Sequence, residues 1–316
     1  MRRWHLLARH RLSALVGCLL VVACGQGWSE RRAGLSEAEL EAHLAEVAAW
    51  REQRDARLRR PDGWLSLAGL FWLSEGDNSV GSMPTSDLVF PAEKAPLELG
   101  VLQRQGEAVT FRPAPGAGVT ADGKPVTAET PLVPDTAGSP TTLERGSLAF
   151  YAVVRGERVG IRLKDRASPL LAEFEGMEYF TVDPEWRLVA RFEPYDPPKT
   201  LKVPNFIGIV EELPSPGAAI LTVDGQEYRL EPTQEGDELF FVFGDATNGG
   251  ETYGGGRFLY TDLPGPDGTV ILDFNRAYNP PCVFTPYATC PLPTAENKLP
   301  IPIRAGERAY EGGYAH

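Results

Sequence analysis

Residues 147–163 read SLAFYAVVRGERVGIRL, two apolar runs separated by a short turn that contains glycine. Runs of this kind, rich in β-branched and aromatic side chains, predict a β-hairpin. Similar short apolar runs recur along the chain at a spacing of roughly ten residues. Asp-Gly pairs at 122–123 and 224–225 are typical of tight hairpin turns. The sequence therefore predicts a mostly β protein.

The composition limits the class of protein. The chain has 316 residues, with 33 Gly and 28 Pro, which favours short strands and turns over long helices. Lys and Arg number 31 against 43 Asp and Glu, so the formal net charge is −12. An acidic protein is poorly suited to the phosphate backbone, so we expect no nucleic-acid partner.

The one clear helix is predicted over residues 35–60. Ser36 followed by Glu39 has the pattern of a capping box. Pro61 ends the segment. The expected apolar stripe consists of Leu40, Leu44, Val47 and Leu58. We expect the helix to pack on the domain that follows it, a β-sandwich over residues 61–170, and a second antiparallel β domain over residues 171–316.

The N-terminal segment predicts that the protein is exported. Residues 1–23 combine a basic start with twelve apolar residues at 12–23, too few to span a bilayer, which needs roughly 20. The letters VVAC at 21–24 look like a bacterial lipobox, in which Cys24 carries the lipid; the alternative is a plain signal peptide with an accidental cysteine. Residues 24–34 predict a tether. We expect a lipid-anchored protein of the bacterial cell envelope, with the membrane as partner through that anchor, facing the periplasm or the exterior.

Five motifs occur in order along the chain. They are PDGWLSLAGLFWL at 61–73, RFEPYDPP at 191–198, DATNG at 245–249, YGGGRFLY at 253–260, and DFNRAYNPPC at 273–282 continuing to CPLP at 290–293. Together they resemble the family catalogued as domain of unknown function 1684, over roughly residues 45–312. The resemblance implies no reaction, because that family carries no established activity.

A second resemblance covers residues 74–165 only. VGS at 80–82, SDLVFP at 86–91, ADGKPV at 121–126 and LERG at 143–146 are similar in order to a forkhead-associated sandwich. That family binds phosphothreonine through an arginine after the first glycine, and Ser82 occupies this position here. The resemblance therefore implies the forkhead-associated-like scaffold without the phosphopeptide function.

The small number of histidines limits the kinds of catalytic and metal site that the chain can form. Once the leader is removed, the chain keeps only His43, expected on an exposed face of the helix, and His316 at the end. Neither suits a Ser-His-Asp or Cys-His site, and no zinc motif occurs, so we expect no metal and no cofactor. Asp and Glu remain as the abundant acid–base residues. The expected function is to bind an unknown small ligand or protein; the alternatives are a carboxylate-dependent hydrolase in the envelope and a purely structural module.

Polar and aromatic side chains gather near the ends of late strands. Arg257, Asp273 and Asn275 lie at strand ends, which is where a ligand site is expected, although a structural network fits them nearly as well. The candidate ligand-binding residues are Arg257, Asp273, Asn275, Tyr278, Asn279, Arg191 and Tyr253. We expect residues 273–290 to form one wall of a cleft, with Arg257 opposite Asp273 and the two tyrosines as apolar walls.

The loop at 244–251 allows two interpretations. Asp245, Asn248 and Glu251 could offer oxygen ligands to a ligand or cation. Alternatively, the Asp and Asn side chains cap the backbone of their own loop.

Cys282 and Cys290 are the other cysteines of the exported chain. An oxidising compartment favours a disulfide between them, and two free thiols are the alternative.

Overall fold

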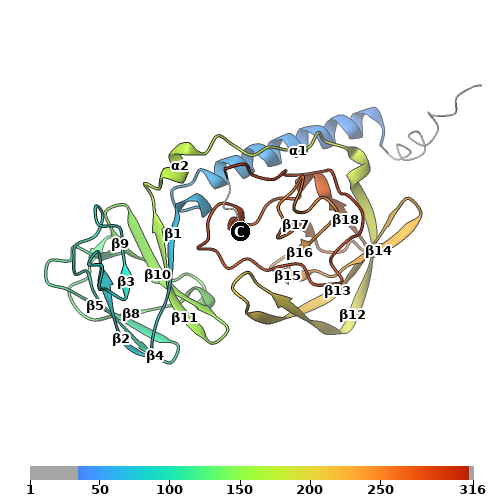
Figure 1. Cartoon of the computed structure of the whole chain (residues 1–316). Helices are drawn as coiled ribbons and strands as arrows, with labels where there is room; N and C mark the ends of the chain where they lie inside the picture. Colours follow the sequence, from blue (N-terminus) through green and yellow to red (C-terminus); the bar gives the residue numbers. More distant parts are fainter. Residues whose placement is uncertain (1–34, 313–316) are drawn as a thin grey trace, which may run out of the picture.

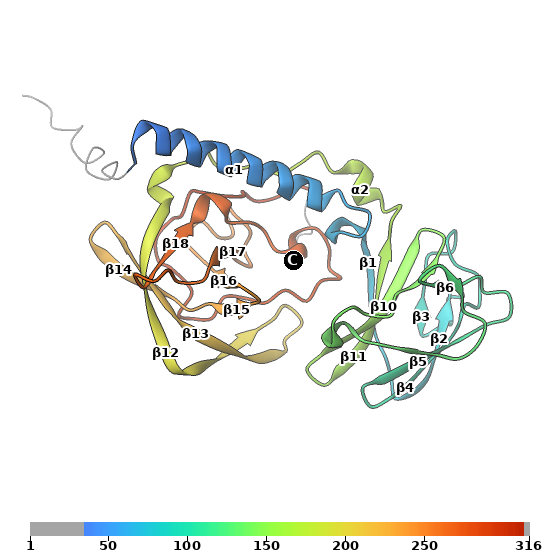
Figure 2. The same ribbon diagram turned by 180° about the vertical axis from the view of Figure 1, so that it is seen from behind.

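The computed structural model describes residues 35–312. Two β units lie side by side, and helix α1 (Glu37–Leu58) runs along the second unit towards the first (Figures 1 and 2). The predicted fold class, mostly antiparallel β with an N-terminal helix, is confirmed. The predictions of a signal peptide, a tether and a lipidated Cys24 concern residues outside the described range.

Helix α1 begins with the predicted capping box. The Ser36 hydroxyl accepts a hydrogen bond from the Glu39 amide at 3.3 Å, and the Glu39 carboxylate accepts one from the Ser36 amide at 2.7 Å. The predicted apolar stripe is only partly correct, because Leu44 is 41% exposed. The residues that the helix buries are His43, Val47, Arg54 and Leu58.

The first unit is a two-layer sandwich with one shared core. One sheet has the order β1 (Leu67–Trp72), β11 (Arg158–Asp165), β10 (Leu148–Arg155), β9 (Leu143–Arg145), β6 (Thr120–Ala121) and β7 (Lys124–Pro125). The other has the order β3 (Leu88–Val89), β2 (Gly76–Gly81), β4 (Gly100–Gln105), β5 (Ala108–Pro113) and β8 (Thr130–Leu132). Phe111 and Phe150, from opposite sheets, pack edge to face with ring centroids 5.8 Å apart. The hairpin predicted over residues 147–163 is formed by β10 and β11.

The second unit encloses a separate core with a four-stranded and a three-stranded sheet. The first has the order β14 (Gln226–Leu230), β13 (Val210–Val223), β12 (Arg187–Pro204) and β18 (Thr269–Asp273). The second has the order β15 (Thr233–Glu235), β16 (Glu238–Phe243) and β17 (Arg257–Asp262). After β18 the chain makes the short 3-10 helices η4 (Phe274–Arg276) and η5 (Pro281–Val283), and then crosses this unit without further strands.

The two units are joined where the chain enters and leaves the sandwich. The 3-10 helix η1 (Trp64–Ser66) precedes β1, and helix α2 (Pro169–Glu173) follows β11. Both contribute to one apolar cluster with the end of α1. Two further 3-10 turns are η2 (Asp135–Ala137) and η3 (Pro184–Trp186). Among the described residues, no helix is both long and apolar enough to cross a bilayer.

Candidate functional site

The end of β18 is the first place where the predicted site residues meet. Asp273 accepts hydrogen bonds from the Asn275 amide at 3.2 Å and side chain at 3.0 Å, which starts helix η4. Its other oxygen lies 2.9 Å from His43 Nε2 and 3.3 Å from Arg276 Nε. The expectation that His43 lies on an exposed helix face is wrong, since it is 3% exposed. Asp273 therefore binds helix α1 to the second unit.

The expected pairing of Arg257 with Asp273 is also wrong. Arg257 is fully buried, and its Nη2 donates to Asp245 Oδ2 at 2.8 Å. The same guanidinium donates to the carbonyls of Ile303 and Ala305. Burial lowers the pKa of Arg257, and Asp245 opposes that shift. The two terminal nitrogens of Arg257 are thus bound to protein groups, and the side chain anchors the C-terminal segment.

The loop at 244–251 follows its structural interpretation. Asp245 Oδ1 accepts from the amide and hydroxyl of Thr247 at 2.8 and 2.6 Å. Asn248 accepts from the Asp245 amide at 2.6 Å and donates to the Tyr253 carbonyl at 2.9 Å. In the described part of the chain, no group of His, Cys, Asp and Glu could hold a metal ion.

The remaining candidate ligand-binding residues do not form one site. Asn275 exchanges two hydrogen bonds with the Asp183 backbone, and Asn279 donates to Glu307 and to the Arg308 carbonyl. Both asparagines are fully buried. Arg191 and Tyr253 have other surroundings. Arg191 is exposed beside Glu193 and Glu227. Tyr253 packs in apolar clusters, where burial raises its pKa to about 12. Of the seven candidates, Tyr278 alone lines a cavity described below.

A buried pair that the sequence analysis missed fixes the surroundings of Tyr278. Arg54 Nε donates to Glu307 Oε1 at 2.8 Å, and both side chains are almost fully buried. The Arg54 guanidinium lies 4.7 Å from the ring centroids of both Trp64 and Tyr278. A pattern in the sequence contained the signal, because His43, Val47, Arg54 and Leu58 fall on one helical face.

A groove of about 670 Å³ opens beside this pair, between α1, the sandwich and the second unit. Its aromatic lining consists of Trp50, Trp64, Tyr260 and Tyr278. Tyr278 is near the centre, with ring centroids 6.2 Å from Trp64 and 6.4 Å from Tyr260, both stacked. The rings therefore form a continuous wall.

The charged lining is predominantly basic. The cations are Arg54, Arg57, Arg60, Lys164 and Arg276, and the anions are Asp62, Glu235 and Glu238. Arg60 is bound to Asp62, and Arg276 to Glu46 and Asp273. The Arg57 side chain makes no hydrogen bond or ion pair with any described residue. Arg57 is thus one cation available to an incoming anion.

Lys164 is the second available cation. Its Nζ donates only to the Asp62 carbonyl, at 2.6 Å. Burial lowers the pKa of Lys164, Asp62 opposes the shift and Arg162 adds to it. An anion placed in the groove would stabilise the charged ammonium, so binding and protonation of Lys164 should be coupled.

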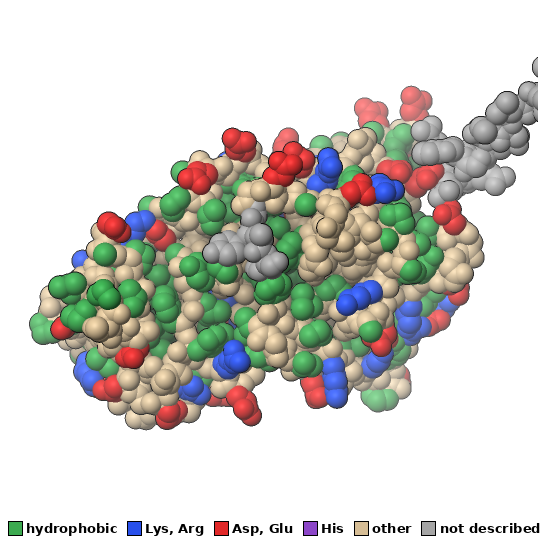
Figure 3. Space-filling view, in the orientation of Figure 1, with side chains coloured by type: hydrophobic (Ala, Val, Ile, Leu, Met, Phe, Trp, Pro, Cys, Tyr) green, Lys and Arg blue, Asp and Glu red, His purple; other side chains and the backbone are tan. Residues whose placement is uncertain are grey.

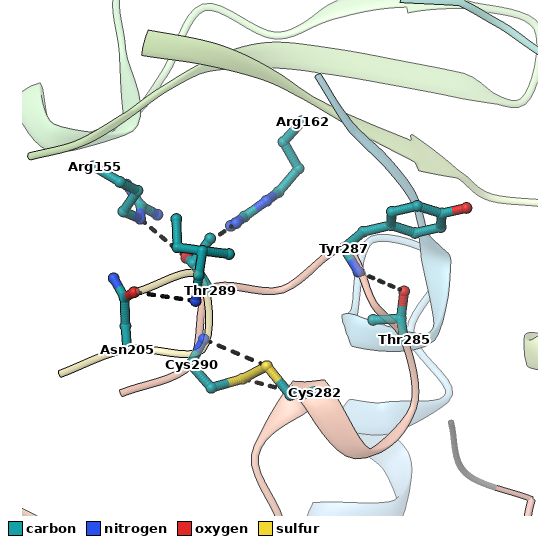
Figure 4. Close-up of a disulfide and its surroundings, with 9 residues drawn as sticks. Arg155, Arg162, Asn205, Cys282, Thr285, Tyr287, Thr289 and Cys290 are labelled. Carbon is teal, nitrogen blue, oxygen red and sulfur yellow. Dashed lines mark hydrogen bonds between the residues drawn. A yellow bond between two sulfur atoms is a disulfide. The ribbon is translucent and has the colours of Figure 1, made fainter. Parts of the chain in front are cut away.

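The disulfide holds a loop against the sandwich. Cys282 and Cys290 form a disulfide, with Cα atoms 6.2 Å apart (Figure 4). The Thr289 hydroxyl accepts from Arg155 at 3.2 Å and from Arg162 at 3.4 Å, both on the β10–β11 hairpin. The bridge thus sits where the two units touch.

The comparisons with known proteins add a family and no activity. The model described as "Protein of unknown function (DUF1684)" matches residues 172–308, which confirms the predicted resemblance over this segment. No curated protein matches the chain. A solution NMR structure of an uncharacterized protein from Haloarcula marismortui is 29% identical; the match covers 43% of this chain and 78% of that one, with a TM-score of 0.36. The forkhead-associated resemblance of the sandwich stays a prediction.

Proposed function

Because residues 172–308 match the model of a family of unknown function, DUF1684, we propose a function from the geometry of the groove. The protein is a lipid-anchored envelope protein that binds a small anionic ligand with a planar or apolar face. The observation that carries this proposal is the position of Arg57 and Lys164 beside the wall formed by Trp64 and Tyr278.

Two kinds of contact support binding of such a ligand. A planar or apolar face can stack on the aromatic rings, as is typical of ligand sites with a few placed polar groups. The anionic group can then reach Arg57 and Lys164, which form charge-assisted hydrogen bonds with carboxylate, sulfate or phosphate oxygens. The volume of about 670 Å³ lies within the usual range of small-molecule sites.

The envelope location rests on two supports. The sequence around Cys24 has the lipobox pattern, and Cys282 and Cys290 are paired as expected in an oxidising compartment.

The exposed side of α1 carries Glu37, Glu39, Glu41, Glu46 and Glu52, and acidic side chains line this edge in Figure 3. This edge would be repelled by an anionic membrane surface, so the lipid must supply the attachment.

The alternative of a carboxylate-dependent hydrolase has less support. Such an enzyme needs a carboxyl group that is free to exchange a proton with the substrate. In the groove, Asp62 accepts two hydrogen bonds from Arg60, and Glu235 accepts one from Tyr260. These contacts occupy two of the three carboxylates that line the groove.

Calorimetry with naphthalene-2-sulfonate tests the proposal, with the neutral naphthalene-2-sulfonamide as a matched probe. We expect the sulfonate to bind at least tenfold tighter, and Lys164→Gln or Arg57→Gln to remove that preference. Lys124→Gln, an exposed lysine of β7, is the control and should change nothing. Equal affinity for the two probes, or unchanged affinity in both groove variants, would reject the proposal.

A further inference from the structure

A second cavity, of about 370 Å³, lies against the long strands β12 and β13 of the second unit, and its lining also includes Arg155 of the sandwich. Its apolar walls come from Leu201, Val203, Leu213, Phe240, Val242 and Leu292. Glu235 is the residue that borders both this cavity and the groove. The cavity is therefore a neighbour of the groove, and its apolar walls are mainly aliphatic where those of the groove are aromatic.

Two polar atoms in this lining have no partner. Asn205 is 5% exposed, and its Oδ1 accepts from the amides of Ile207 at 3.2 Å and Ile209 at 2.9 Å. These two bonds fix the orientation of the carboxamide, so the other atom is the NH₂ donor. Asn205 Nδ2 is buried without a hydrogen bond, and so is the hydroxyl of Thr294. Figure 4 shows Asn205 with its oxygen engaged and its nitrogen directed away.

The other buried polar groups of the cavity are already used. Asn297 bonds the backbone of Glu231 and Val242 through its oxygen and its nitrogen. The Glu231 carboxylate accepts from Lys199 at 2.8 Å and from Tyr195. The lining thus keeps one unmatched amide donor and one unmatched hydroxyl, both buried just behind its surface, and both groups can bind a carbonyl oxygen that reaches them.

We propose that this cavity is a second binding site, which takes a neutral aliphatic molecule that carries a carbonyl group, such as an acyl amide, ester or ketone. The aliphatic chain fills the space lined by leucine and valine, and the carbonyl oxygen accepts from Asn205 Nδ2 and the Thr294 hydroxyl. A buried donor left unmatched is costly, so a ligand that supplies the acceptor gains from that contact.

The charges around the cavity favour a neutral ligand over a fatty acid. Three carboxylates line it, those of Glu211, Glu231 and Glu235, against the single cation Arg155. Arg155 already forms a two-point ion pair with Asp135. A ligand carboxylate would therefore meet net repulsion in this cavity, whereas the groove favours anions.

Ligand-observed NMR titration with N,N-dimethyloctanamide tests the proposal. This probe has a carbonyl acceptor and no donor, and octanoate serves as its charged counterpart. We expect saturable binding of the amide, at least tenfold tighter than octanoate, with no competition from naphthalene-2-sulfonate. Competition between the two probes, or no saturable binding of the amide, would overturn the assignment of a separate site.

Three variants locate the contact. Asn205→Asp keeps the oxygen that holds the turn and removes the donor, and Thr294→Val removes the hydroxyl at nearly the same volume. Each should weaken amide binding at least tenfold, while Thr200→Val, at an exposed position of the strand β12 that precedes Asn205, should leave it unchanged. Leu213→Trp should fill the cavity and abolish binding. Unchanged affinity in the Thr294 and Leu213 variants would overturn the proposal, even if Asn205→Asp fails to fold.

Discussion

His43 and Asp273 form a buried hydrogen bond, 2.9 Å from Nε2 to Oδ2, between residues 230 positions apart in the sequence. The bond joins the first half of α1 to the point where β18 ends and η4 begins. Together with the Arg54–Glu307 pair, it attaches α1 to the second unit rather than to the sandwich that follows it in sequence. The expectation that the helix packs on the next domain is therefore wrong.

Removing this bond should destabilise the protein. His43→Leu keeps an apolar side chain in the space and leaves one Asp273 oxygen without the imidazole, for an expected loss of about 1–3 kcal/mol in the free energy of unfolding. Denaturant unfolding measures the loss. Leu44→Ala, at the exposed neighbouring position, should change the same quantity far less. Equal stability of wild type and His43→Leu would contradict the structural role.

Arg257 should behave as half of a buried ion pair. Arg257→Ala leaves Asp245 and two carbonyls unmatched, so we expect a loss of about 3–5 kcal/mol in the free energy of unfolding. A double-mutant cycle of Arg257→Ala with Asp245→Asn should show strong coupling. The cycle with Asp273→Asn should be additive within about 0.5 kcal/mol, because the two residues share no contact. Strong coupling with Asp273→Asn together with additivity with Asp245→Asn would instead support the Arg257–Asp273 pairing expected from the sequence.

The Glu231 carboxylate should give the protein a pH-dependent stability. Burial alone would raise the pKa of Glu231, but hydrogen bonds from Lys199 and Tyr195 outweigh it and lower that pKa. The unfolded chain then binds the proton more readily, so this contribution is present above the ordinary pKa of about 4.3 and is lost as the pH falls through the lowered folded value.

Unfolding of wild type and Glu231→Gln across that pH range measures this effect. The variant should be less stable at pH 7, and the difference should shrink as the pH falls. Glu107→Gln, at an exposed position in the sandwich, is the control and should show no such trend. A difference that stays constant with pH would show that the interaction does not depend on the charge of Glu231.

The disulfide can be tested by counting free thiols. Unfolded, unreduced protein should show no free thiol from Cys282 and Cys290, while reduction should release two per chain. A loop of nine residues, counting both ends, predicts a loss of about 2.5 kcal/mol when the bridge is removed. A Cys282→Ser, Cys290→Ser double variant measures this loss without leaving a single reactive thiol.

Cys24 should carry the lipid. Membrane fractionation should place the wild type with the membranes and Cys24→Ala in the soluble fraction, because the acyl chains supply the anchor. Mass spectrometry of the mature protein provides a second measurement. An unmodified Cys24 there would leave the plain signal peptide as the explanation for the first 23 residues.

Local patterns predicted local structure well, and distant contacts poorly. The capping box at Ser36, the β10–β11 hairpin and the Cys282–Cys290 pairing each involve residues close in sequence. Arg54 and Glu307, by contrast, lie 253 positions apart, and neither residue type is expected in a core. Their burial depends on a partner that sequence patterns do not specify. The motif of Tyr278 identifies it as a candidate, but the groove around it is built from five separate stretches of the chain.

The pair formed by Arg54 and Glu307 also has a consequence for the order of folding. The sandwich core is built from residues 68–163, so it can form as soon as that stretch is available. The second unit is closed by residues from both ends of the described chain, and contacts of such separation form slowly because a long loop must first close. Helix α1 is synthesised before the sandwich and lacks the partner of Arg54 until Glu307 is available, although helices in proteins owe most of their stability to tertiary packing. The sandwich is inserted in the sequence between α1 and the rest of the second unit. It therefore folds before the second unit is complete.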